Sequence, residues 1–336
     1  MRQAMTEETT SRRRQTPVMA ALLVATVMTA WAGSLQAEVT VKKVDKKVRV
    51  EIDGELFTEY IYQDWPRPYL FPVLAPGGES VTRSWPMKDG VAGEQKDHPH
   101  HRGLWHGHQY ISGHDLWHQG GGKGQIVHQD ILEMKSGDVG VLKVRNRWFS
   151  PQQKEILATD EVTYRFFEKD GARILDFDVL VKATHGDVVF GDEKDGFVAM
   201  RVNPALRVKN AQGGRGTGSA LNSAGQKDAA LWGQAAKWLD YWGPIDGKTV
   251  GIAMFDHPGN LRHPTTWHAR DYGLVTANPF GTYFFTGEKG PRQAGKHTLK
   301  AGESLQFRYR FYIHNGDATQ AKIVERYEQY TKEKDE

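Results

Sequence analysis

The stretch VTYRFFEKDGARILDFDVLV, residues 162–181, decides the fold class of this sequence. When apolar residues recur at every second position of a strand, they form one face that packs against a core. Asp-Gly is typical of a tight turn between two strands. Apolar side chains alternate with other residues on both sides of Asp170-Gly171, at Val162, Tyr164, Phe166, Leu175, Phe177, Val179 and Val181. The stretch therefore predicts a β-hairpin on a half-buried sheet.

The same pattern recurs along the chain. It surrounds Asp53-Gly54 in residues 48–62, follows Asp246-Gly247 in residues 250–254, and is longest in residues 305–314. Thirty-six glycines and the shortage of helical patterns favour antiparallel sheets over alternating β-α units. We therefore expect an all-β fold: one large antiparallel β-sandwich domain over residues 38–336 with one C-terminal helix.

One helix is predicted near the C-terminus. Asp317 occupies a capping position, and Gln320, three residues later, occupies the Glu/Gln position of a capping box. The apolar stripe that follows consists of Ala321, Ile323, Val324 and Tyr327. We expect this helix to pack on the outside of a sheet.

Residues 1–37 have the pattern of a secretory signal peptide. Residues 12–14 are arginines, residues 18–30 are largely apolar, and residues 34–37 end in the small residue that is typical of a cleavage site. We expect cleavage after Ala37, by a Sec or twin-arginine route, and a periplasmic or secreted protein without membrane contact after leader removal.

Charge and cysteine content narrow the chemistry. Without the four arginines and two glutamates of the leader, 40 basic and 39 acidic residues remain, so nothing favours nucleic acid or an anionic membrane as a partner. The absence of cysteine excludes disulfides and thiolate catalysis, and it leaves His, Asp and Glu as metal ligands. We predict no cofactor and a small-molecule or oligosaccharide substrate, and we leave the oligomeric state open.

Eight of the fourteen histidines lie between His98 and His128. Histidine offers a proton-transfer group, a metal ligand and a neutral hydrogen-bond donor near neutral pH. We therefore predict that this segment lines a polar substrate site, with His101 and His106 as acid–base candidates. The binding candidates in the segment are His98, His100, Arg102, Trp105 and His108.

A transition metal is the alternative interpretation of this segment. Its ligands would be His98, His100, His106 and His108, because His-x-His in an extended strand points both rings to one face. The site would need a further ligand, such as His118 or Glu94. Since no carboxylate lies at a diagnostic spacing, we favour proton transfer.

A second polar segment, residues 256–270, follows a predicted strand and suits a loop that closes over a substrate. Its acid–base candidates are His257 and His268. The binding candidates in and beyond this segment are Asn260, Arg262, Trp267, Arg270 and Asn278.

Acid chemistry also needs a carboxylate. The candidates are Asp192 and Asp195 in the acidic turn of residues 190–196, with Glu193 between them and Arg201 as a binding residue beyond it. Tryptophans add flat apolar faces that fit sugar rings, although core packing explains them equally well.

These residues carry a resemblance to a known family. The matching strings are Arg67-Pro68-Tyr69 with Pro72-Val73, residues 97–105, Gly191-Asp192 with Asp195-Gly196 and Arg201-Val202, and residues 256–260, 267–270 and 278–281. Over nearly all of the chain beyond the leader, the sequence resembles the bacterial PmoA-like proteins, which carry the name of the methane oxygenase PmoA and are also treated as a domain of unknown function. Where the family more often reads Asp-Thr-Lys-Glu-Gly, this chain has Asp192-Glu193-Lys194-Asp195-Gly196, which makes Asp195 a better positional match than Glu193.

The resemblance implies a fold similar to the galactose-mutarotase-like β-sandwiches of sugar epimerases, lyases and hydrolases. Methane oxygenase activity is rejected, because the membrane enzyme needs several apolar spans of about 20 residues and none follows the leader. Our first hypothesis is an exported carbohydrate-active hydrolase, lyase or epimerase that uses histidine and carboxylate acid–base chemistry. The alternatives are a non-catalytic sugar-binding module and a histidine-ligated metal enzyme.

Overall fold

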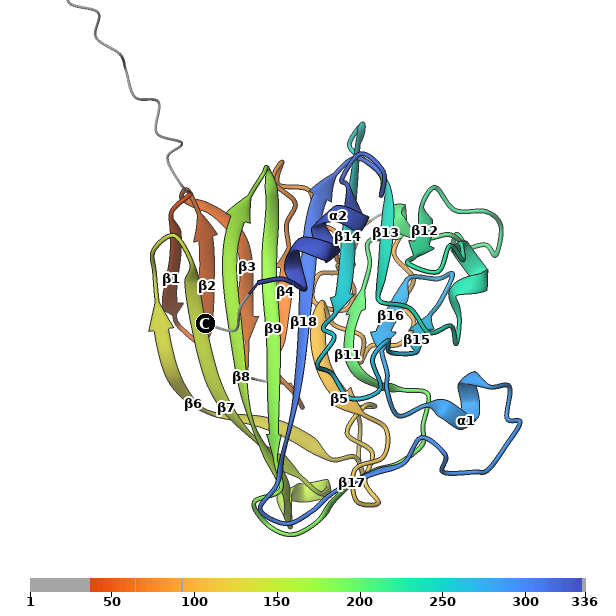
Figure 1. Ribbon diagram of the computed structural model, residues 1–336. Helices are drawn as coiled ribbons and strands as arrows, with labels where there is room; N and C mark the ends of the chain where they lie inside the picture. Colours follow the sequence, from red (N-terminus) through yellow and green to blue (C-terminus); the bar gives the residue numbers. More distant parts are fainter. Residues whose placement is uncertain (1–36, 64, 92, 334–336) are drawn as a thin grey trace, which may run out of the picture. The chain divides into compact units, whose positions relative to one another are not determined.

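The computed structural model describes residues 37–63, 65–91 and 93–333. Except for Ala37, the expected signal peptide lies outside these ranges. All pairings between the described strands are antiparallel, and they form two eight-stranded sheets and one two-stranded sheet. The predicted all-β antiparallel sandwich is therefore confirmed (Figure 1).

The first large sheet has the strand order β1-β2-β3-β4-β5-β11-β16-β15. Its strands are β1 (Val39–Val44), β2 (Lys47–Ile52), β3 (Glu55–Ile61), β4 (Tyr69–Val73), β5 (Leu104–His108), β11 (Gly196–Arg201), β16 (Leu274–Ala277) and β15 (Trp267–Ala269). The long loop between β4 and β5 and the loops around β11 and β16 carry most of the polar residues singled out above. Segments far apart in the sequence thus become neighbours in this sheet.

The second large sheet has the order β12-β13-β14-β18-β9-β8-β7-β6. Its strands are β12 (Ser219–Asn222), β13 (Trp238–Ile245), β14 (Lys248–Asp256), β18 (Ser304–Asn315), β9 (Ala172–Lys182), β8 (Ile156–Lys169), β7 (Gly140–Phe149) and β6 (Gln125–Lys135). The smallest sheet pairs β10 (Val188–Phe190) with β17 (His297–Leu299). The predicted hairpins correspond to β2-β3, β8-β9 and β13-β14.

The hairpin of residues 162–181 packs as its alternation predicts. Val162 faces Val179 across β8 and β9, and Tyr164 faces Phe177. These four side chains are at most 2% exposed and belong to the core between the two large sheets. Because burial of apolar area is the main favourable term in folding, this shared layer holds the sheets together.

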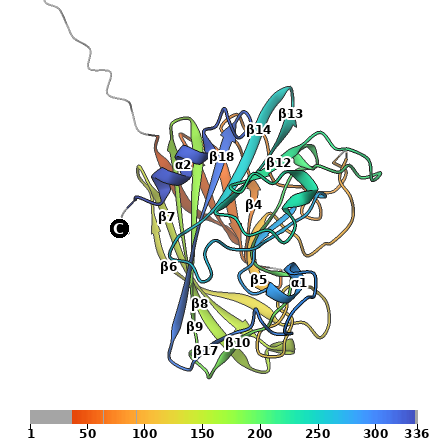
Figure 2. The same cartoon turned by 45° about the vertical axis from the view of Figure 1, so that its right-hand side comes forward.

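The C-terminal helix α2 (Ile323–Tyr330) covers the outer face of the second sheet. In Figure 2, α2 and the first-sheet strands β4 and β5 lie on opposite sides of β18. Tyr327 packs edge-on against Phe255 of β14, with 5.7 Å between the ring centroids. The predicted position of the helix outside a sheet is therefore confirmed.

Details of the helix prediction need correction. The capping box forms, because Asp317 Oδ1 accepts from the backbone N–H of Gln320 and Gln320 Oε1 accepts from that of Asp317. It caps only a turn, since Lys322 has a left-handed φ of 54° and the helix begins after it. Val324 is 54% exposed and so is not part of the apolar stripe.

Short helical segments interrupt the loops. A one-turn helix, α1 (Thr282–Phe285), was not predicted. In the part of the chain that the structure describes, three 3₁₀ turns occur at Pro151–Gln153, Pro204–Leu206 and Asp228–Leu231. Among the described residues, no helix is long and apolar enough to cross a membrane.

Candidate functional site

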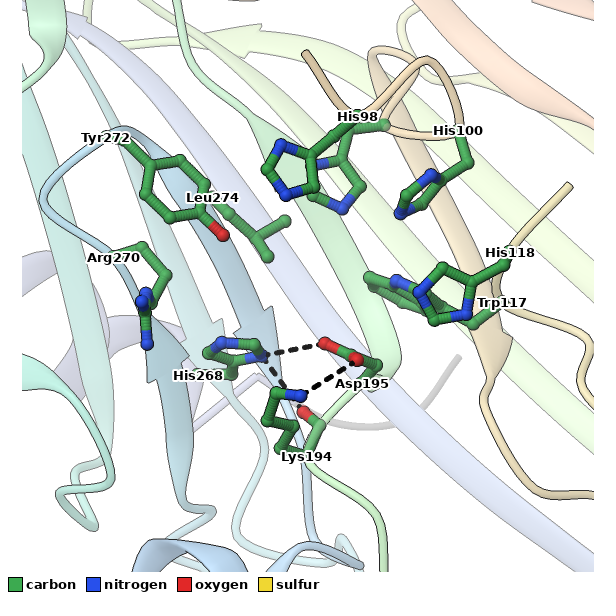
Figure 3. Close-up of a pocket in the computed structure, with 11 residues that line it drawn as sticks. His98, His100, Trp117, His118, Lys194, Asp195, His268, Arg270, Tyr272 and Leu274 are labelled. Atoms are coloured by element: carbon green, nitrogen blue, oxygen red, sulfur yellow. Dashed lines mark hydrogen bonds and ion pairs between the residues drawn. The ribbon is translucent and has the colours of Figure 1, made fainter.

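A cavity of about 350 Å³ lies on the outer face of the first sheet, away from the core between the sheets (Figure 3). We call it the histidine pocket. It is lined by His98, His100, His101, Trp117, His118, Lys194, Asp195, His268, Arg270, Tyr272 and Leu274. Its size lies within the usual range of small-molecule sites.

The strand register explains how distant residues share this face. Arg201 of β11 pairs with Leu274 of β16, and Thr276 of β16 pairs with His268 of β15. Leu274 and Thr276 are two residues apart, so they and their cross-strand partners point to one side of the sheet. His268, which comes from the second polar segment, therefore lies in the same pocket as residues of the first.

A buried arginine, Arg83, fixes the loop that carries His98, His100 and His101. The guanidinium of Arg83 donates to the carbonyl oxygens of Asp97, His98 and His101 and pairs with the Asp97 carboxylate at 2.6 Å. Burial opposes the charge of Asp97, but the hydrogen bond from His98 and the charges of Arg201 and Arg83 hold its pKa well below the usual range. Asp97 is thus ionised and orders the loop.

His101 has a defined tautomer. Nη1 of Arg201 lies 3.1 Å from its Nδ1, and since a guanidinium only donates, this nitrogen accepts and the neutral ring carries its proton on Nε2. Burial, followed by the positive charge of Arg201, lowers the pKa of His101 well below the usual value. His101 is therefore a neutral hydrogen-bond donor at neutral pH.

His268 has the opposite tautomer. Its Nδ1 lies 3.0 Å from the carbonyl oxygen of Lys194, which only accepts, and 3.4 Å from Oδ1 of Asp195 (Figure 3). The proton is therefore on Nδ1, and Nε2 holds a free lone pair. Burial lowers the pKa of His268 to about 4, although the Asp195 charge opposes this shift. At neutral pH His268 can accept a proton.

His118 forms a third oriented histidine. Its Nδ1 is 2.9 Å from Oδ2 of Asp115, while Oδ1 of Asp115 accepts from the backbone N–H groups of Trp117 and His118. Burial opposes the charge of Asp115, but hydrogen bonds from His118 and Lys123 hold its pKa well below the usual range. The ionised carboxylate therefore orients the ring, as in other His-carboxylate pairs.

Asp115 was missed in the sequence. The sequence signal that could have found it is an Asx turn, in which an Asp side chain accepts from the backbone N–H groups two and three residues later. Asp115 precedes Trp117 and His118 at this spacing. Lys194 and Tyr272 were also missed, and both line the pocket.

His106 and His108 lie outside the pocket. They alternate with Trp105 along β5, so their rings point into the core while Trp105 lies in the aromatic cluster on the outer face. His106 Nε2 is 2.8 Å from Oδ2 of the fully buried Asp160, and His108 Nε2 donates to the carbonyl of Gly191. Trp105 stacks on His101 at 5.5 Å between ring centroids.

Asp192, another acid–base candidate, is 1% exposed and also does not line the pocket. Its carboxylate accepts from the backbone N–H groups of Tyr283 and Gly295, which places it under the α1 segment. Asp195 is the carboxylate of this turn that lines the pocket, and Asn278 supports it by donating to the carbonyls of Glu193 and Lys194.

The remaining candidates of the second segment do not line the pocket, and the ring of His257 instead packs against Tyr330 of α2. His257 is at the start of a turn in which Asn260 bonds to Asp256, and Arg262 donates to three carbonyls that include that of Pro279. Trp267 is buried in the core and donates to the carbonyl of Ala236.

Arg102 and Gly103 complete the first segment. The Arg102 guanidinium lies 3.2 Å over the ring of Trp65, outside the pocket lining. Gly103 has a φ of 51°, and a Cβ atom there would overlap the carbonyl of Leu70. Only glycine therefore allows the loop to enter β5 at this place.

The four histidines of the metal alternative divide between two places. His98 and His100 line the pocket, whereas His106 and His108 face the core. Within the ranges that the structure describes, no group of three or more His, Asp or Glu side chains is arranged to hold a metal ion.

Nine solved chains match this one, and two of them show how remote the likeness is. The 4-alpha-glucanotransferase of Thermococcus litoralis matches with 11% identity and a TM-score of 0.24 over 84% of this chain and 38% of that enzyme, so this chain spans about two fifths of its length. A galactose mutarotase related enzyme from Lactobacillus acidophilus matches with 10% identity and a TM-score of 0.25 over 82% of this chain and 97% of that one. No curated protein matches the sequence significantly.

A family model matches residues 47–328, which include the second large sheet, all of the first except β1, and every residue that lines the histidine pocket. The chain therefore belongs to the family of unknown function DUF6807.

Proposed function

We propose that this protein is a carbohydrate-active enzyme that moves protons to and from a sugar in the histidine pocket. The observation that carries the proposal is the pair of opposite tautomers in one cavity: His101 presents Nε2–H, and His268 presents a bare Nε2. Both rings are neutral at pH 7, because burial lowers their pKa values. One proton donor and one proton acceptor are what general acid–base catalysis needs.

In the proposed mechanism, His268 takes a proton from the substrate through Nε2. Its imidazolium is then stabilised by the Lys194 carbonyl and the Asp195 carboxylate next to Nδ1. His101 donates a hydrogen bond from Nε2 to the substrate oxygen on which negative charge develops. The proton held by His268 returns to the product or to solvent, which restores the neutral ring.

His118 supplies a second imidazole from another side. It lies in the loop after β5, whereas His268 is on β15, three strands further along the first sheet. In Figure 3, His118 and His268 approach the pocket from different sides. Such an arrangement suits proton transfer at two faces of a sugar ring.

The pocket composition fits a sugar. Trp117 and Tyr272 provide apolar surface, and histidine, aspartate, lysine and arginine side chains provide hydrogen-bonding groups around it. Among the described residues that line the pocket, Asp195 is the single carboxylate. Glycoside hydrolysis commonly uses two carboxylates across the scissile bond, so this composition favours an epimerase or a lyase over a hydrolase.

We further propose that the protein acts outside the cytoplasm, supported by the leader pattern of residues 1–37.

We also propose that the protein is one of the bacterial PmoA-like proteins, which is a finer assignment than the family of unknown function. The support is that residues 97–105 and 267–270, two of the strings that carry this resemblance, contribute His98, His101 and His268 to the pocket.

The test is a panel of neutral and acidic mono- and oligosaccharides, followed by NMR with the wild-type protein, with His268→Gln and with the exposed His185→Gln as the matched control. We expect turnover by the wild type and by the control, and a loss of at least 100-fold in His268→Gln. Binding without turnover by the wild type would instead favour a sugar-binding module. Activity that requires added metal, with bound metal in untagged protein, would favour the metal enzyme.

A further inference from the structure

We propose that the sugar bound in the histidine pocket carries a carboxylate, as a uronic acid does, and that Arg270 is the residue that binds it. This inference rests on the acid–base function proposed above and adds the class of substrate. It begins from a cation in the pocket wall that has no acidic partner.

Arg270 follows β15 and lines the pocket. Within the described ranges, its guanidinium makes no hydrogen bond or ion pair, and its protein contact is the ring of Tyr272, 5.4 Å from the guanidinium carbon to the ring centroid. Figure 3 shows Arg270 and Tyr272 on the same side of the pocket, next to His268. The N–H groups of Arg270 are thus available to a ligand.

The charges on the pocket wall do not balance. Lys194 Nζ lies 3.6 Å from Oδ2 of Asp195, so that the one carboxylate among the described residues of the wall already has a cation. The charge of Arg270 remains unmatched. An anionic ligand would restore the balance at this place.

The buried charges next to the pocket are also predominantly positive. Arg83, Arg201 and Arg207 interact there with two carboxylates, Asp97 and Glu94. The histidines His100, His101 and His268 add no positive charge at neutral pH, since their pKa values are lowered by burial first of all. The surplus of positive charge comes from arginine, and it favours an anion in the pocket.

A carboxylate fits Arg270 better than a single-point anion does. The planar guanidinium offers parallel N–H groups that match the two oxygens of a carboxylate. Such hydrogen bonds to charged groups are stronger than neutral ones. The ring of Tyr272 lies beside the guanidinium, 5.4 Å from its central carbon, and limits the positions that the guanidinium can take.

The proposed chemistry needs such a group. The proton on the carbon next to the carboxylate passes to Nε2 of His268, and the electron pair of the broken C–H bond moves into the carboxylate, which becomes an enediolate. Arg270 stabilises the added negative charge. The enediolate can then react in two ways, by elimination or by epimerisation.

In elimination, the electron pair forms a C=C bond, the C–O bond to the next carbon breaks, and the leaving oxygen takes the proton from His268. In epimerisation, the imidazolium form of His118, paired with Asp115, delivers its Nε2 proton to the opposite face and then takes up a proton from solvent, while His268 releases its proton to solvent. Both routes begin with the same exchange of a carbon-bound proton.

The experiment measures binding by calorimetry and carbon-bound hydrogen exchange by NMR in D₂O. The probes are oligosaccharides of galacturonate, glucuronate and mannuronate, their neutral counterparts, and sulfated and phosphorylated sugars as separate arms. We compare the wild type with Arg270→Gln, Arg270→Lys and the control Arg145→Gln, which is on β7 of the other sheet.

We expect the wild type and the control to bind a uronate more tightly than its neutral counterpart and to exchange the proton next to its carboxylate. Arg270→Gln should weaken uronate binding by roughly 10- to 100-fold without changing the binding of neutral sugars. Arg270→Lys, which keeps the charge but loses the paired N–H groups, should lose several-fold. Binding of the uronate should also raise the pKa of His268, followed by imidazole NMR.

Equal binding of neutral and acidic sugars, or uronate binding unchanged in a folded Arg270→Gln, would overturn the inference while leaving the acid–base function intact. Preference for sulfated or phosphorylated sugars would overturn the carboxylate assignment. If no sugar of any class binds or reacts, the function proposed above fails as well.

Discussion

Arg201 donates a hydrogen bond from Nη1 to Nδ1 of His101 over 3.1 Å, and the same guanidinium contacts both oxygens of Asp97. Arg201 is 1% exposed, so this contact is sheltered from solvent. One arginine thus fixes the tautomer of a pocket histidine and pairs with the carboxylate that orders the loop. The orientation of His101 is decided by a residue one hundred positions away in the sequence.

Replacement of Arg201 by lysine should therefore impair catalysis more than binding. A single ammonium group cannot hold Asp97 and Nδ1 of His101 in the same geometry, so the proton of His101 is no longer confined to Nε2. We expect kcat to fall roughly 10- to 100-fold with little change in KM. Imidazole ¹⁵N shifts should show mixed tautomers for His101, and an unchanged Nε2–H tautomer would contradict this account.

The pH dependence of turnover should report His268. Its pKa is lowered to about 4, so the lone pair on Nε2 is free at neutral pH and is lost as the pH falls through about 4. We expect kcat/KM to be flat through neutral pH and to decrease up to tenfold per unit below about pH 4. A pH–rate profile over the range in which the protein stays folded checks this. An acidic limb centred near pH 6.5 would mean that a different group acts as the base.

Asp115→Asn should test the orientation of His118. The amide is close in shape to the carboxylate and can still accept from the N–H groups of Trp117 and His118, but it removes the charge beside Nδ1. We expect a loss of roughly 10- to 100-fold in kcat with a thermal midpoint within a few degrees of the wild type. A shifted pH profile would separate this effect from a merely structural one. Equal kcat in both proteins would remove His118 from the mechanism.

His106 should act in stability rather than in catalysis. The buried carboxylate of Asp160 accepts from His106, Asn146 and Trp148. Removal of one partner from such a buried charged network typically costs about 3–5 kcal/mol. We expect this loss in the free energy of unfolding for His106→Leu, measured by urea denaturation, while kcat of the folded fraction stays within about twofold. A loss of turnover comparable to that of His268→Gln would return His106 to the list of catalytic residues.

Acid should destabilise the protein before the pocket titrates. Burial lowers the pKa values of His108, His128 and His268 to about 4, while unfolded histidine titrates near 6.5. Between these values the unfolded chain binds protons that the folded chain does not, so stability rises with pH and is lost as pH falls. Each such group contributes up to about 1.4 kcal/mol per pH unit.

Urea denaturation at pH 7, 6 and 5 measures this loss. His128→Gln should reduce the slope of the free energy of unfolding against pH by the contribution of one histidine. Lys135→Gln on the same strand, β6, is the control because it changes no imidazole. A stability that is constant from pH 7 to 5 would contradict the prediction.

Much of the fold could be predicted because strand patterns are local. Val162 to Val181, Val48 to Ile52 and Leu305 to Ile313 alternate with a period of two, and each stretch forms the predicted strands. The α2 capping box was also visible, but the left-handed Lys322 that delays the helix has no such signature. Val324 was misplaced because the packing of a short helix depends on the sheet beneath it.

The unusual chemistry of the segment from His98 and the antiparallel strands can both be predicted from local sequence patterns. Which histidines share a pocket depends on the tertiary structure. The same alternation that identifies β5 turns His106 and His108 into the core and Trp105 outward, and the number of histidines does not reveal which face is which. The strand order β5-β11-β16-β15 then brings His101, Asp195, His268 and Arg270 to one outer face. Side-chain spacing is a local property of the chain, whereas sheet order depends on long-range burial of the faces that must leave water.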